Sequence, residues 1–212
     1  MHVTLPEALL LFALHDAKGT VHSVAFLAID HALRAAVLSE LKLRGHVQTR
    51  LPSEIRHHPR PPEPPSLPIL RDALAALASS PSPGPIKAWS LRLAAVMPDL
   101  RERLTVLLEH RGILGKIDRE RSGLTDEVAF PLTDTGTEER LKKSLSDGLD
   151  AGTDIAPREG VLLALTVACH LHPLVVGGER AEDAEGRAGW VSDRDAIVSA
   201  AMRAIAEAEG EW

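Results

Sequence analysis

Two stretches of the chain are apolar on nearly every side of the helix that they predict, and this constrains the fold more than any other feature. Residues 7–16 read EALLLFALHD and residues 158–172 read REGVLLALTVACHLH. Thr4 and Glu7 have the spacing of a helix-capping box, and Pro157 suits the first turn of the second helix. A helix without a polar face must be surrounded by other elements, so both stretches are predicted to lie at the centre of the fold.

The remaining predicted helices are amphipathic and would surround this centre. Aromatic residues make up only 3% of the chain, so the core must be mainly aliphatic, which favours helix. We expect a mainly α fold and a compact single domain over residues 1–212. The predicted amphipathic helices are residues 26–43, 67–80, 86–96, 98–112 and 138–149, and a last helix that carries Ile197, Val198, Ala201, Met202 and Ile205.

Three segments are predicted to be loops and one to be a short β-hairpin. Residues 59–68 contain six prolines, which excludes helix and central strand, and residues 80–85 are also rich in proline. We expect both to be exposed loops within one domain. Glycine-rich residues 175–189 are predicted to be a loop as well. Residues 112–132 place two short apolar pieces around a polar middle, which favours a hairpin.

The charge of the chain argues against general nucleic-acid binding. The formal net charge is −6, whereas nucleic-acid binding requires a basic surface. Residues 42–60 nevertheless hold five Lys or Arg and one Glu, which would attract a localised anionic partner or form a solvated loop. The single cysteine, Cys169, fits a reducing cytoplasm. The abundance of arginine over lysine and the absence of asparagine suggest a bacterial source.

A search for catalytic and metal-binding motifs is negative. The chain has no nucleophile elbow, phosphate-binding loop, dinucleotide fingerprint or zinc-protease motif. Cys169 and His172 share one helix face, but a zinc site needs a third and fourth ligand, and no second cluster has suitable spacing. We therefore expect a protein that is not an enzyme and that uses no metal or cofactor. An enzyme with an unrecognised pocket is the less favoured alternative.

Several stretches, in order, resemble the Golgi phosphoprotein 3 family. VTLPEALLLFALHDAKG at residues 3–19 is similar to the apolar first helix of that family, and LRAAVLSELKLRG at residues 33–45 is similar to its second helix. Further matches are AWSLRL (88–93), DLRERLTVLLEHRGIL (99–114), FPLTDTGTEERLKKSL (130–145) and VLLALTVACHL (161–171). The resemblance covers nearly the whole chain.

The resemblance implies a mainly helical domain that associates peripherally with membranes by binding an anionic lipid headgroup. In eukaryotic members this lipid is phosphatidylinositol 4-phosphate, and those members act as adaptors that retain glycosyltransferases. For this chain it implies a cytoplasmic protein at the inner face of a membrane, with its protein cargo unknown.

The headgroup pocket of the family uses one tryptophan and three basic residues, and the resemblance transfers only part of it. Arg34 and Arg101 fall on two of the basic positions. The third falls on Pro98, and the tryptophan position falls on Ala25, with Phe26 beside it as a partial substitute. Paired guanidinium groups suit a phosphate, so two arginines would retain weakened headgroup binding.

Simpler interpretations exist for the same residues. An Asp30–Arg34 pair at helical spacing would neutralise Arg34, and Asp99 or Glu102 would do the same for Arg101. In the hairpin 112–132, Asp126 and Glu127 would be repelled by anionic headgroups, which argues against insertion and leaves self-association as its expected role. The alternative function is a protein-interaction module of the same fold without lipid binding.

Overall fold

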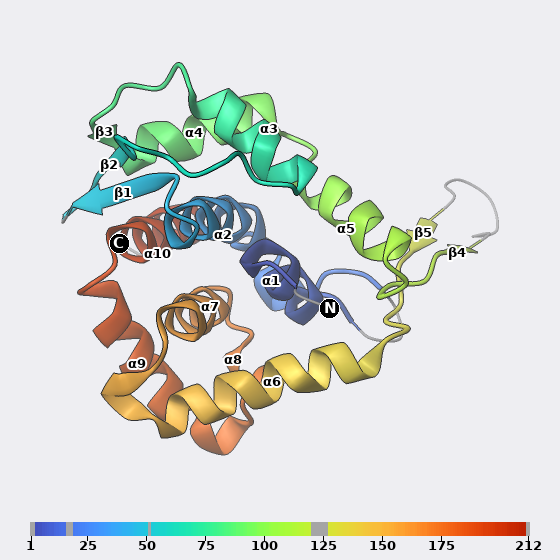
Figure 1. Cartoon of the computed structure of the whole chain (residues 1–212). Helices are drawn as coiled ribbons and strands as arrows, with labels where there is room; N and C mark the ends of the chain where they lie inside the picture. The colour runs from blue at the N-terminus through green and yellow to red at the C-terminus, as the bar shows by residue number, and fades with distance from the viewer. Residues whose placement is uncertain (1–2, 16–18, 51, 120–126, 211–212) are drawn as a thin grey trace.

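The computed structural model describes residues 3–15, 19–50, 52–119 and 127–210, and this part of the chain is mainly helical (Figure 1). Its α-helices are α1 (Leu5–Ala13), α2 (Ile29–Leu43), α3 (Pro68–Leu77), α4 (Ile86–Val96), α5 (Leu100–His110), α6 (Thr135–Asp150), α7 (Pro157–Ala168), α8 (His172–Val175), α9 (Ala181–Ser192) and α10 (Ala196–Glu209). Short 3₁₀ turns are η1 (Ser23–Ala25), η2 (Gly152–Asp154) and η3 (Gly178–Arg180).

The two apolar stretches form central helices, as predicted. All nine residues of α1 are buried, and so are residues 160–168 of α7. The helix α2 is the third central element and packs against both of them. Figure 1 shows these three helices in the middle, with α3, α4 and α5 along one side and α6 and α9 along another. A fold with apolar helices at its centre and amphipathic helices around them is therefore confirmed.

A small antiparallel sheet lies beside α2 and corrects one predicted loop. The sheet contains β1 (Val47–Arg50), β2 (Glu54–His57) and β3 (Gly84–Pro85), with Val47 opposite His57 and Ile55 opposite Gly84. The prediction that residues 80–85 are entirely loop is wrong for the last two. Proline is accepted there because β3 is an edge strand, which needs no second set of ladder bonds.

The other proline-rich segment, residues 59–68, is a mostly exposed loop in which Pro65 is buried, and its last residue belongs to a helix. Pro68 is the first residue of α3, and Leu67 precedes it as the N-cap. Proline is accommodated in the first helical turn because the amide it lacks would have no helical partner there.

Residues 112–132 contain the predicted hairpin. The strands β4 (Ile117–Arg119) and β5 (Glu127–Ala129) pair antiparallel, with Ile117 opposite Ala129. Leu114 and Leu132 form a further bridge at its base. Asp126, which the sequence argument used against membrane insertion, lies outside the described residues.

The prediction of a loop over residues 175–189 is wrong, because its second half belongs to α9. Ala184, Ala188 and Val191 recur at helical spacing and are buried where α9 packs on α7. Gly160 of α7 makes this packing close, since a Cβ there would lie 3.3 Å from a methyl group of Val191. The glycines within the segment suggested a loop, but tertiary burial of a small-residue stripe outweighs their low helix propensity.

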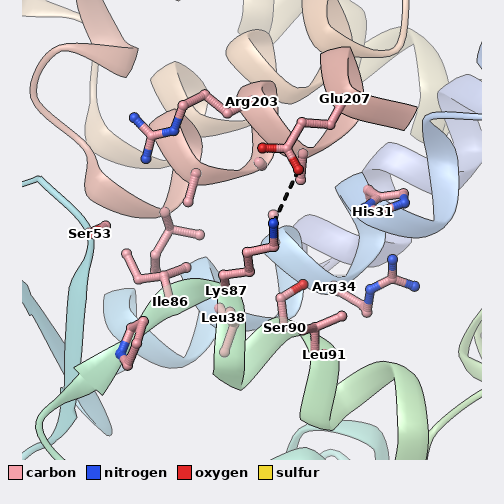
Figure 2. A pocket seen from close by; sticks show the side chains of 16 residues that line it. His31, Arg34, Leu38, Ser53, Ile86, Lys87, Ser90, Leu91, Arg203 and Glu207 are labelled. Carbon is pink, nitrogen blue, oxygen red and sulfur yellow. Dashed lines mark hydrogen bonds and ion pairs between the residues drawn. The ribbon is translucent and has the colours of Figure 1, made fainter. Parts of the chain in front are cut away.

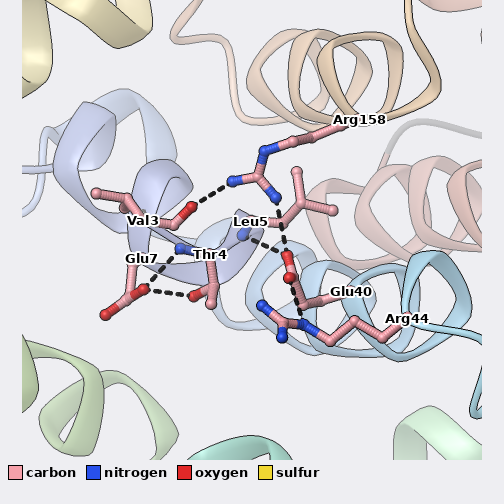
Figure 3. A network of polar contacts seen from close by, with 7 residues as sticks. All are labelled: Val3, Thr4, Leu5, Glu7, Glu40, Arg44 and Arg158. Carbon is pink, nitrogen blue, oxygen red and sulfur yellow. Dashed lines mark hydrogen bonds and ion pairs between the residues drawn. The ribbon is translucent and has the colours of Figure 1, made fainter. Parts of the chain in front are cut away.

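A buried carboxylate joins α1, α2 and α7. Glu40 on α2 accepts hydrogen bonds from the backbone N–H of Leu5 at 2.8 Å, from Nε of Arg44 at 2.7 Å and from Nη1 of Arg158 at 3.0 Å (Figure 3). Arg158 also donates to the carbonyl of Val3. The Glu40 side chain is 3% exposed, so these donors replace the water that the carboxylate loses.

A second buried carboxylate, Glu7, closes the first turn of α1. Its Oε2 accepts from the backbone N–H of Thr4 at 2.6 Å and from the Thr4 hydroxyl at 2.7 Å. Its Oε1 accepts from Arg111, which follows α5. The predicted capping box is confirmed. Glu7 of α1 and Glu40 of α2 thus each join separate parts of the fold.

Candidate functional site

The candidate site begins with Arg34, on the partly exposed side of α2. Its Nε is buried and has no hydrogen-bond partner among the described residues. Burial lowers the pKa of Arg34 below its ordinary value, and the negative charge of Asp30 partly offsets this. The guanidinium remains charged at neutral pH, because arginine side chains are not deprotonated in proteins. Arg34 is thus a partly desolvated cation with unused hydrogen-bonding capacity.

The expected neutralising partner of Arg34 is engaged elsewhere. The Asp30 carboxylate lies 3.8 Å from Nε of Arg101, in the first turn of α5. This ion pair is half exposed, with 39% of the Arg101 side chain and 54% of the Asp30 side chain accessible. Asp30 is therefore paired with Arg101, the second candidate arginine. Its effect on Arg34 is only electrostatic.

Arg34 lines a pocket between α2, α4 and α10, which we call the α2/α4/α10 pocket (Figure 2). It has a volume of about 270 Å³. The polar residues in its lining are His31, Arg34, Ser53, Lys87, Ser90, Arg203 and Glu207. The apolar residues in its lining are Ala35, Leu38, Pro85, Ile86, Leu91, Ile197, Ala200, Ala201 and Ala204. Arg101 is not part of this lining, so the two candidate arginines do not share this pocket.

The pocket carries a positive charge. Lys87 on α4 and Glu207 on α10 form an ion pair of 3.2 Å across it, and Arg203 donates to the hydroxyl of Ser199 at 3.2 Å. With Arg34, the lining contains three cationic side chains and one carboxylate. The pKa of His31 is lowered, chiefly by burial and then by Arg34, so His31 is neutral at pH 7. The ionised side chains of the pocket therefore sum to +2, which favours an anionic ligand.

Three exposed apolar side chains precede α2. The predicted helix over residues 26–43 begins later, at Ile29, because residues 26–28 form a turn that follows η1. Val24, Phe26 and Leu27 are 51%, 63% and 60% exposed, and we call them the apolar turn. Large apolar side chains that are adjacent in the chain and exposed together indicate an interaction surface.

Two of the transferred positions lack the side chains that the family pattern implies, namely a cation at Pro98 and a tryptophan at Ala25. Ala25, at the tryptophan position, is completely buried, whereas its neighbours Val24 and Phe26 are 51% and 63% exposed. Pro98 lies in the exposed turn before α5, which begins at Leu100 with Asp99 as its N-cap. The prediction that Pro98 occupies the first turn of this helix is wrong, since Asp99 takes the cap position after α4 ends.

The basic segment of residues 42–60 is partly neutralised. Lys42 pairs with Asp195 at 2.6 Å, and that carboxylate also caps α10 by accepting from the backbone N–H groups of Ile197 and Val198. Arg44 is bound to Glu40. Lys42 joins α2 to the start of α10, whereas Arg44 pairs within the end of its own helix, and both pairs reduce the diffuse attraction for anions that the sequence suggested.

The cysteine and histidine that suggested a metal site lie in a structural setting. Burial raises the pKa of the Cys169 thiol to about 12, which disfavours the thiolate that a metal would need. Nε2 of His172 lies 3.1 Å from a carboxylate oxygen of Glu185. Among the described residues, no group of three or more His, Cys, Asp or Glu side chains is arranged to hold a metal ion.

Fold and surface together define a helical domain built on apolar central helices, with an arginine-bearing pocket at its surface. The sequence profile of the Golgi phosphoprotein 3 (GPP34) family matches residues 5–208, nearly the whole chain, and the chain belongs to this family. The resemblance found in the sequence is thereby confirmed. A search among curated proteins returns no match.

Within the part of the chain that the structure describes, none of the helices has the length and apolar character needed to cross a bilayer.

Sequence reasoning missed most of the pocket around Arg34. Lys87, Arg203 and Glu207 come from α4 and α10, far from Arg34 in the chain, and each has the ordinary appearance of an exposed helix charge. Their only signal in the sequence was their presence on amphipathic helices. The packing of α2 against both helices brings them together.

Proposed function

We propose that the protein binds the anionic headgroup of a membrane lipid as a non-enzymatic, peripheral membrane protein. The observation that carries the proposal is the state of Arg34: a partly buried cation whose Nε has no partner among the described residues, while Asp30 is paired with Arg101. A phosphate oxygen would supply the missing acceptor through a charge-assisted hydrogen bond.

The surroundings of Arg34 support a membrane as the source of that phosphate. Asp30 lies one helical turn before Arg34 on α2. Because Arg101 pairs with Asp30, Arg101 lies near the same end of α2 as Arg34. The apolar turn lies directly before this end of the helix. Burying one of its half-exposed side chains in the acyl region would contribute about 1 kcal/mol. Electrostatic attraction and apolar insertion would then act from adjacent parts of the chain.

Phosphatidylinositol 4-phosphate is the specific lipid that the family resemblance implies. The ionised side chains Asp30, Arg34 and Arg101 sum to only +1, and the tryptophan position is the buried Ala25. We therefore propose binding of anionic phospholipid with weak discrimination among headgroups, at the cytoplasmic face of a membrane. Self-association through the hairpin of residues 112–132 stays a prediction.

Vesicle co-sedimentation tests this function. Neutral phosphatidylcholine vesicles are compared with vesicles that also contain phosphatidylglycerol or phosphatidylinositol 4-phosphate. We expect the wild type to sediment only with anionic vesicles, and the double variant Arg34→Ala, Arg101→Ala to lose this. The matched control is Arg140→Ala, Lys143→Ala, which removes two exposed cations from α6.

The interaction-module alternative gives the opposite result. If the wild type and the Arg34, Arg101 variant sediment equally little with every vesicle, lipid binding is excluded. The same fold would then serve protein partners only. Equal loss in the α6 control variant would show that net charge, and not the end of α2, causes the attraction.

A further inference from the structure

The α2/α4/α10 pocket combines two kinds of lining that a simple anion site would not need. Its polar part includes Arg34, Lys87 and Arg203, whereas its apolar part includes Ile86 and the alanines of α10. Figure 2 shows Arg34 and His31 together at one side of the pocket and Ile86 toward the other. Nine of the sixteen lining residues are apolar, so a large part of the pocket wall offers water no hydrogen-bond partner.

The small residues of α10 create the space in the pocket. Ala200, Ala201 and Ala204 present only methyl groups to it, one helical turn or less apart. Opposite them, Leu91 on α4 is 60% exposed and forms part of the wall. An apolar chain entering here would cover an exposed leucine and replace poorly bound water, which favours binding.

The size of the pocket limits its occupant. A volume of about 270 Å³ lies just below the roughly 300–1,000 Å³ of small-molecule sites. The cavity is therefore suited to a short alkyl chain or to the first part of a longer one, and not to a folded partner. The excess positive charge of the lining favours an anionic occupant.

We propose that this pocket binds an alkyl phosphate, with the phosphate against Arg34 and the alkyl chain between α10 and Ile86. The proposal deepens the lipid binding proposed above and rests on it for the role of Arg34. It adds a second requirement, namely that the chain attached to the phosphate enters the protein. The same chemistry occurs in a membrane phospholipid and in a soluble amphiphile, and the test separates the two sources.

Isothermal titration calorimetry of the full chain with octyl phosphate tests the pocket without a membrane. We expect octyl phosphate to bind at least tenfold more tightly than inorganic phosphate or octanol, since each of these lacks one half of the recognised chemistry. Arg34→Ala should lower the affinity for octyl phosphate at least tenfold. Equal affinity for inorganic phosphate would overturn the proposal in favour of a plain anion site.

Filling the pocket provides the decisive variant. Ala204→Phe occupies the space without changing charge and should lower octyl phosphate affinity at least tenfold. Ala208→Phe is the matched control, because Ala208 is an exposed residue of the same helix outside the pocket lining, and it should bind as the wild type does. If Ala204→Phe does not fold, Leu91→Ser tests the same wall from an exposed position and should weaken binding severalfold. Unchanged affinity in the folded pocket variants would overturn the proposed location.

Vesicle co-sedimentation of the same variants separates this inference from the proposed function. Binding to anionic vesicles without any binding of octyl phosphate would reject the alkyl pocket and leave headgroup binding intact. Binding of octyl phosphate without vesicle binding would reject the membrane function and identify a soluble amphiphile as the ligand.

Discussion

The Asp30 carboxylate lies 3.8 Å from Nε of Arg101 on α5, although Arg34 follows one turn later on its own helix. Both arginines were candidates for phosphate binding from the sequence, and one acidic residue now distinguishes them. The ion pair with Asp30 partly neutralises the charge of Arg101. Arg34, in contrast, has a buried Nε without a partner among the described residues.

Removing this carboxylate should strengthen binding to anionic vesicles. Asp30→Asn frees Arg101 and raises the local charge by one, so we expect a severalfold higher vesicle partition coefficient. A half-exposed ion pair contributes only about 0–1 kcal/mol, so the melting temperature should hardly change. Asp72→Asn is the control because it breaks the corresponding pair with Arg103 between α3 and α5. A comparable gain in the control would indicate a general charge effect.

The apolar turn should be required for membrane affinity but not for folding. Phe26→Ser, Leu27→Ser removes two side chains that are 63% and 60% exposed, so the unfolding midpoint in urea should stay near that of the wild type. At about 1 kcal/mol for each side chain, vesicle affinity should fall about tenfold or more. Leu174→Ser changes a residue of α8 that is 51% exposed and should leave affinity unchanged. Retained affinity in the double variant would remove the apolar turn from the membrane contact.

Glu40 should be essential for stability and have no direct role in binding. Glu40→Ala leaves Arg158 and the first turn of α1 without their shared acceptor. Removing one partner of a buried ion pair costs about 3–5 kcal/mol, and urea unfolding should show a loss of this size. Asp147→Asn breaks an exposed pair with Lys143 and should cost less than about 1 kcal/mol. A small loss in Glu40→Ala would show that water replaces the carboxylate.

Acid should destabilise the fold partly through His46. Burial, and then Arg44, lower the pKa of His46 below its ordinary value of 6.5. The folded state therefore binds the proton less readily than the unfolded state, so this stabilisation is present above pH 6.5 and declines as pH falls through the lower folded pKa. His46→Gln should make the free energy of unfolding less dependent on pH between about 7 and 5. The same pH dependence in both proteins would assign the effect to other groups.

The sequence was most informative where a residue's surroundings depend on its near neighbours. The run ALLLF at residues 8–12 has no polar face, so this part of α1 had to be buried whatever packed around it. The same reasoning failed for α9, because its glycines and acidic residues predict a loop unless Ala184, Ala188 and Val191 are seen against α7. A stripe of small residues predicts a buried helix only when the helix that packs against it is known.

The sequence alone therefore determined the helical core, the family and the position of Arg34 on α2, since these depend on short-range periodicity and on motifs in order along the chain. Only the tertiary structure decided that Asp30 pairs with Arg101, that Glu40 serves the fold, and that Lys87 and Arg203 join Arg34 around one pocket. These relationships depend on how α4, α5, α7 and α10 pack against α1 and α2. The choice among nearby partners of a charged side chain is set by that packing, because electrostatic and hydrogen-bonding partners must lie within a few ångströms in space, however far apart they are in the chain.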